Sequence, residues 1–151
     1  MSVINIEIKN IKQIRQAFGL APALMTKNLS TAIKQTIFFV RAKAVSNAPV
    51  RTSNLRGSVY QSFGPLKGEI GFNAKYAGWV HDGTSPYTIR PKTKKALYWK
   101  GASHPMRLVR HPGIKANPYL QRAVDDSQEQ IDKFFVKAVQ NALNVIGKKA
   151  G

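Results

Sequence analysis

Apolar side chains recur every three or four residues between about Ala23 and Asn47, and this pattern constrains the fold more than any other feature of the sequence. Such spacing places side chains on one stripe of an α-helix, and the stripe here consists of Leu29, Ile33, Ile37, Val40 and Ala44. Pro49 ends the pattern, because proline lacks an amide hydrogen and disfavours helical angles at the residue before it. We therefore expect one long helix whose stripe faces a core.

A second long helix is predicted near the C-terminal end. Asn117 is expected to cap it and Pro118 to occupy its first helical position, since both residue types favour those places. One face of this helix stays apolar to about Ile146, through Leu120, Val124, Ile131, Phe135, Ala138 and Ala142. The chain then closes with a basic end at Lys148 and Lys149.

Shorter elements are predicted before and between these helices. Residues Val3 to Lys9 alternate like a half-buried strand, and Asn10 can cap a short helix that ends at Gly19, before a turn at Pro22. Ser58 to Phe63 and Glu69 to Asn73 read as an antiparallel hairpin around a turn at residues 64–68.

Further along, Tyr76 to Val80 fits either a third strand or a short helix. Thr84 to Lys100 reads as strand, basic turn and strand, and residues 101–116 as a mobile loop. We expect an α+β fold in which a small, mostly antiparallel sheet packs against two long helices, with residues 1–151 forming a single domain.

Charge is the most unusual property of the composition. The chain has 24 Lys and Arg against 7 Asp and Glu, a formal net charge of +17 and a pI of about 10.5, which favours binding to polyanions. Tyr87, Tyr98 and Trp99 interleave with cations as in single-stranded nucleic-acid sites, but a core role for these rings is the favoured interpretation. The residues expected to face DNA or another polyanion are Arg90, Lys92, Lys94, Lys95, Lys100, Arg107 and Arg110.

Residue patterns typical of catalysis do not occur in the sequence. It has no cysteine, no nucleophile-elbow motif and no phosphate-binding glycine loop. No two of His81, His104 and His111 have the helical spacing of metal ligands, and no acid lies near two of them. No apolar run reaches the roughly 18 residues of a spanning helix, so we expect a non-enzymatic protein without metal, cofactor or membrane contact.

Two motifs carry a resemblance to a known family. Ala48 to Ser58 resembles an Ala-Pro-basic-Thr-Gly-x-Leu-Arg-x-Ser loop, and Tyr76 to Thr84 resembles a Tyr-Ala-x-x-Val-Glu-x-Gly-Thr segment. Together with the later Asn117-Pro118-Tyr119-Leu120, their order is similar to that of tailed-phage head-to-tail joining, neck or tail-completion proteins. Ser53 stands where the family usually has Gly, and His81 where it usually has Glu.

This resemblance implies a virion protein, assembled in the host cytoplasm, whose copies form a ring at the head-tail connector or tail top. Neighbouring connector, head-closure or tail-tube proteins would be its other partners. Residues expected at subunit or partner interfaces are Arg51, Thr52, Asn54, Leu55, Arg56, Tyr76, His81, Asp82, Thr84, Asp125, Asp126 and Glu129. For Arg51 and Arg56, simple solvation is an equally good interpretation. The alternative function is sequence-nonspecific nucleic-acid binding, with contact to packaged DNA open in either case.

Overall fold

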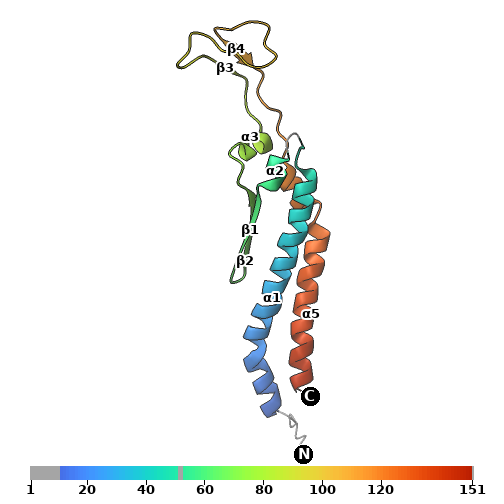
Figure 1. Ribbon diagram of the computed structural model, residues 1–151. Helices are drawn as coiled ribbons and strands as arrows, with labels where there is room; N and C mark the ends of the chain where they lie inside the picture. The colour runs from blue at the N-terminus through green and yellow to red at the C-terminus, as the bar shows by residue number, and fades with distance from the viewer. Residues whose placement is uncertain (1–10, 51–52, 151) are drawn as a thin grey trace, which may run out of the picture.

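The computed structural model describes residues 11–50 and 53–150 (Figure 1). The strand predicted for Val3 to Lys9 and the cap predicted at Asn10 lie outside these residues. Within them, the order of elements is helix, short helix, hairpin, short helix, two short strands and two helices. The α+β fold with two long helices is confirmed.

The first element, α1 (Ile11–Asn47), is one helix of 37 residues that runs through both Gly19 and Pro22. The predicted break before Pro22 is therefore wrong. Proline has a φ angle that suits a helix, but inside one it removes the hydrogen bond to the carbonyl four residues earlier and its ring crowds that carbonyl. Pro22 and Phe18 are both exposed, so water can bond that carbonyl.

The C-terminal helix is divided into α4 (Tyr119–Asp125) and α5 (Gln128–Ala150), whereas one continuous helix was predicted. Between them the buried Ser127 hydroxyl donates to the carbonyl oxygen of Ala123, a local bond that competes with regular helix geometry. Pro118 takes the cap position rather than the first helical one. Asn117 instead accepts a hydrogen bond from Arg122 through its side-chain oxygen.

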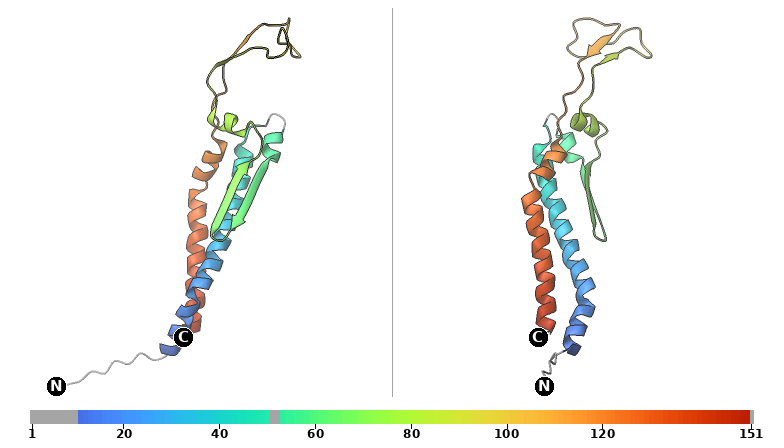
Figure 2. Two further views of the ribbon diagram at one scale, coloured as in Figure 1. Left: turned by 90° about the vertical axis from the view of Figure 1, so that its left-hand side faces the viewer. Right: turned by 180° about the vertical axis from the view of Figure 1, so that it is seen from behind.

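Helices α1 and α5 lie side by side and antiparallel along most of their length (Figures 1 and 2). Small buried side chains at Ala32, Ala138 and Ala142 allow this close approach, and the rings of Phe39 and Phe134 pack edge to face between the helices. The predicted apolar stripes of both helices therefore face each other or the adjoining core.

The hairpin β1 (Val59–Gly64) and β2 (Lys67–Phe72) pairs antiparallel as predicted, although its turn is shorter and consists of residues 65–66. It packs on α1, where Gly68 lies so close that any β-carbon would collide with Ile33 and Ile37. From β2, Ile70 and Phe72 reach the core formed by Val40, Ala44 and Ala123.

A second cluster of buried residues lies beside two short helices, α2 (Asn54–Gly57) and α3 (Ala77–Asp82). Its buried members are Ala48, Leu55, Ala77 and Tyr119. The segment for which strand and helix were both open is thus a helix.

Residues 84–114 form an arm that projects beyond α3, away from the α1–α5 pair (Figures 1 and 2). In this arm β3 (Tyr87–Ile89) pairs antiparallel with β4 (Val109–His111). The strand, basic turn and strand predicted for Thr84 to Lys100 are wrong in their second strand, because the partner of β3 is β4, which lies inside the segment assigned to an irregular loop. Leu97 forms only an isolated bridge, to Met106.

Candidate assembly interface

The loop that carries the first family motif folds back on the end of α1. Ser53 adopts a left-handed conformation with φ 57°, the backbone geometry for which glycine is favoured. Leu55 is buried, and Asn54 is exposed. The predicted interface residues Arg51 and Thr52 lie outside the described residues.

Arg56, in α2, bonds to the end of the preceding helix α1. Its Nε donates to the carbonyl oxygen of Ala48 and one Nη donates to that of Ser46, each at 2.9 Å. Ser46 lies in the last turn of α1 and Ala48 directly follows the helix, at an end where helix carbonyls lack amide partners and the dipole favours a cation. The structure thus gives this side chain a capping role within the chain.

The second family motif forms α3, and its residues gather around Tyr119. The Tyr119 side chain is only 2% exposed; it meets Phe72 and His81 edge to face and donates to the carbonyl oxygen of Ala77 at 3.4 Å. Burial raises the pKa of Tyr119, and the nearby Asp82 and then Tyr76 raise it further. His81 Nδ1 lies 2.6 Å from an Asp82 carboxylate oxygen.

The root of the arm is a close backbone crossing. Thr84 and Ile114 exchange both backbone hydrogen bonds, and the Thr84 hydroxyl accepts a further bond from the Ile114 amide. Gly113 has φ 88°, and a β-carbon there would collide with the carbonyl oxygen of Thr84. Only glycine therefore fits this crossing without strain. Thr84 is thus placed at the root, where it fixes the path of the arm.

The arm has two different faces. Successive side chains of a strand point to opposite sides, and the paired residues Tyr87 with His111 and Ile89 with Val109 share one face. The pair between Thr88 and Arg110 lies on the other face. One face is therefore aromatic and aliphatic, and the other polar and basic.

All seven cations predicted to face a polyanion lie in this arm, and all are exposed. The arm, residues 84–114, contains no Asp or Glu. Like charges crowded on a narrow ribbon repel one another, so an anionic partner would stabilise the arm. The seven residues are Arg90, Lys92, Lys94, Lys95, Lys100, Arg107 and Arg110.

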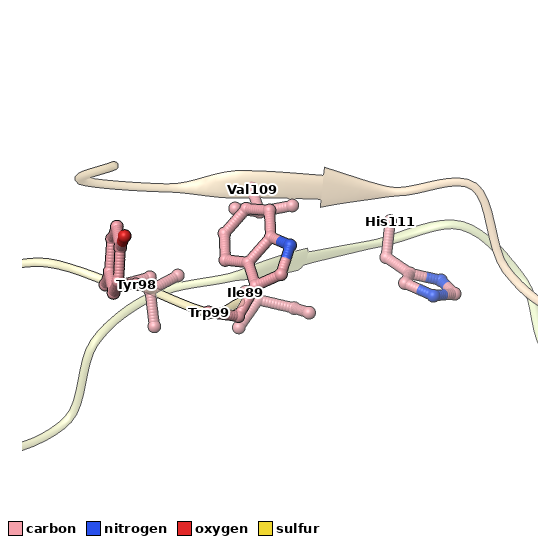
Figure 3. Close-up of a pocket in the computed structure, with 6 residues that line it drawn as sticks. Ile89, Tyr98, Trp99, Val109 and His111 are labelled. Carbon is pink, nitrogen blue, oxygen red and sulfur yellow. The ribbon is translucent and has the colours of Figure 1, made fainter. Parts of the chain in front are cut away.

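A pocket on the apolar face of the arm was missed by the sequence interpretation. It measures about 450 Å³ and is lined by Ile89, Leu97, Tyr98, Trp99, Val109 and His111. Figure 3 shows Tyr98 and His111 at its two ends with Trp99 between them. The favoured core role is wrong for the rings, because Tyr98 is 69% exposed and Trp99 46%. The alternation of apolar and basic residues in Val109-Arg110-His111 was the sequence signal that could have predicted this strand and its apolar face.

The predicted acidic interface residues Asp125, Asp126 and Glu129 are exposed where α4 meets α5. Glu129 forms an ion pair with Lys133 one turn later, and the hydrogen bond and charge of this lysine lower the pKa of Glu129. The structure thus separates the predicted residues into three places: the region around Tyr119, the arm, and this acidic segment.

The described residues include no group of three or more His, Asp or Glu arranged to hold a metal ion. No helix in the described part of the chain has the length and apolar character needed to cross a membrane.

Comparison with known families gives a match to the N-terminal part of the chain. Residues 12–83, just under half of the chain, match the model of the HK97-gp10-like family, described as "Bacteriophage HK97-gp10, putative tail-component". The resemblance to a tailed-phage tail-component family is confirmed. The tail-component segment comprises nearly all of α1 together with α2, the β1–β2 hairpin and α3, and it ends at Gly83, the root of the arm. No curated protein and no solved structure gave a significant match.

The tail-component family supports a structural role in a bacteriophage tail and interaction with other virion proteins. Its model stops where the arm begins, so the arm, α4 and most of the exposed charge lie outside the matched segment. The properties of those parts come from the structure alone.

Proposed function

We propose that this protein is a structural virion component that assembles as a homo-oligomeric ring at the head-tail connector or tail top, where it joins or completes the tail. The observation that carries the proposal is the family match over residues 12–83, which contains the first of the two motifs and all of the second except Thr84. Connector, head-closure or tail-tube proteins are its proposed neighbours. Assembly takes place in the host cytoplasm.

The distribution of charge supports assembly from copies. The cations of the arm and the acids at the junction of α4 and α5 lie in separate places on an otherwise basic chain. A chain with separated opposite charges can pack head to tail, and such contacts close into a ring when the rotation between copies permits. Exposed residues of the two motifs, Asn54, Tyr76 and Asp82 among them, are proposed interface residues on the body.

The basic face of the arm is proposed to contact the phosphates of DNA that passes through the ring. Lysine and arginine contacts to phosphate do not depend on base sequence and weaken as salt concentration rises. A passage for DNA requires contacts of this kind, since any base can lie beside the protein. Exposure of all seven arm cations supports this role.

Deletion of the gene in its parent phage or prophage tests the proposed function. We expect induced lysates, viewed by negative-stain electron microscopy, to contain filled heads beside unattached or abnormally long tails. Complementation with the intact gene is the control and should restore joined particles. Normal infectious particles from the deletion strain would refute the structural role.

A triple Lys→Gln variant tests the arm separately from the rest of the protein. The exposed Lys92, Lys94 and Lys95 are neutralised in one variant, and the exposed Lys27, Lys34 and Lys43 of α1 in a matched control. Both lose three charges, but only the arm variant should lower infectious titre, with unchanged helix content by circular dichroism. Equal titres for the two variants would remove the arm cations from the proposal.

A free, sequence-nonspecific nucleic-acid-binding protein is the second candidate function. The observation that favours it is the presence of exposed rings, Tyr98 and Trp99, beside the arm cations. Rings that stack on bases and cations that contact phosphate are the parts of a single-strand binding site. Tight, salt-dependent binding of an oligonucleotide by the monomer would favour this function, whereas weak binding with self-association would favour the ring.

A further inference from the structure

The apolar face of the arm is open to solvent. The arm leaves the body at the crossing of Thr84 and Ile114, and no described part of the body covers its far end in any view (Figures 1 and 2). Two paired strands of three residues each have little stability without packing against another element. A partner that covers this face would stabilise the arm.

The pocket and its surroundings define the chemistry of that partner. The walls provided by Ile89, Leu97 and Val109 are aliphatic, and the exposed rings of Tyr98 and Trp99 extend them. The arm that carries this pocket has seven exposed lysines and arginines and no acids. The complementary surface therefore presents an apolar side chain with carboxylates beside it, because unlike charges at an interface select and orient partners.

The outer face of α5 has this chemistry. Glu129, Asp132 and Val136 are exposed at helical spacing, which places them along one line of the helix surface. Together with Lys133 and Lys137 they line a shallow groove of about 600 Å³, and Val136 is 55% exposed. We name this line of residues the α5 ridge.

We infer that the arm pocket of one copy receives Val136 and the α5 ridge of a second copy, with arm lysines beside Glu129 and Asp132. This inference rests on the proposed ring. The ridge of the same chain is out of reach, because the arm points away from the α1–α5 pair (Figure 1) and its root is held by the crossing at Gly113. The contact joins two different surfaces. Each copy can therefore use its arm pocket to bind one neighbour and its α5 ridge to bind the other, around a closed ring.

The ion pair already present on the ridge does not oppose this contact. Glu129 bonds Lys133 on the same helix, and both side chains are largely exposed. Exposed pairs of this kind contribute little free energy. Glu129 can therefore exchange Lys133 for a lysine of the arm when a second copy approaches.

Paired cysteines test the contact, since the natural chain has none. Tyr98→Cys combined with Val136→Cys should give a ladder of disulfide-linked multimers under mild oxidation, in the purified protein and in particles. The matched control pairs Tyr98→Cys with Leu20→Cys, which replaces another exposed apolar residue, on α1. Each single variant is a further control, and neither these nor the control pair should give a ladder.

The possible outcomes separate this inference from the proposed function. Multimers that form without the Tyr98–Val136 ladder would overturn the contact and leave the ring standing. A wild-type protein that stays monomeric in solution and is absent from particles would overturn both. If Tyr98→Ala abolishes retention of an oligo-dT probe but leaves self-association unchanged, the pocket belongs to stacked bases and the inference is wrong.

Discussion

Replacing Arg56 by Met tests whether this residue caps α1 or serves a partner. The change removes the guanidinium and keeps most of the apolar stem. Two bonds are lost, from Nε to Ala48 and from Nη to Ser46. The bond to Ala48 is partly buried and the bond to Ser46 is exposed to solvent, so they do not contribute equally.

The size of the effect follows from these two bonds. A hydrogen bond from a charged group contributes roughly 1.5–3 kcal/mol when shielded from water, and a cation at a helix C-terminus adds about 0.3–1 kcal/mol. The exposed bond to Ser46 contributes little, so Arg56→Met should lower the free energy of unfolding by about 2–3 kcal/mol. Arg56→Lys should lose roughly half as much, because an ammonium keeps the charge without the forked geometry.

Urea unfolding followed by circular dichroism measures this change in unfolding free energy. The dependence of that free energy on urea concentration should be the same in the variant and the wild type. Arg41→Met is the matched control, since Arg41 is exposed on α1 and makes none of the side-chain bonds found among the described residues. It should change the free energy by less than about 0.5 kcal/mol. If Arg56→Met is as stable as the control yet prevents joining of heads to tails, the capping argument is wrong and Arg56 is an interface residue.

Two further predictions concern the root of the arm and the ring beside it. Gly113→Ala should increase the hydrogen-exchange rate of the Ile114 amide at least tenfold, because the new β-carbon collides with the Thr84 carbonyl oxygen. The control is Gly101→Ala, at φ 100° but in open space, which should leave the Ile114 amide protected. Equal exchange rates in the two variants would refute the clash. Because the folded pKa of Tyr119 is raised, its contribution to stability is present below the unfolded pKa of about 10 and is lost as pH rises through the folded value. Urea midpoints from pH 8 to 11 should therefore fall less steeply in Tyr119→Phe than in wild type, and parallel curves would contradict this.

Local patterns were sufficient to predict the helical body. The stripe from Leu29 to Ala44 and the one from Leu120 to Ala142 each follow the period of a helix, and both face the core. The β1–β2 hairpin was also predictable, since residues 64–68, which contain two glycines and a proline, separate two short segments of strand-favouring residues. These features depend on residues close in sequence, so a linear pattern is enough to show them.

The same local sequence rules also produced the wrong predictions of helix boundaries, at positions where two of these rules compete. Pro22 was expected to break α1, but its exposed position leaves water to bond the freed carbonyl. The separation of α4 from α5 depends on one hydroxyl bond, from Ser127 to Ala123, which no periodicity predicts. A single hydrogen bond such as this one contributes roughly 1 kcal/mol.

The sequence predicted which residues form the candidate site, but only in part where they lie in the fold. The sequence by itself determined the acid-free run that contains the seven arm cations, the two family motifs and the acidic segment, because these are properties of order and composition. Tertiary structure alone decided that Arg56 turns back on α1, that β3 pairs with β4 rather than with a strand before Lys100, and that Tyr98 and Trp99 face solvent. Each of these depends on which backbone groups and surfaces meet across 8 or more residues of chain, and that choice is made by packing and not by local propensity.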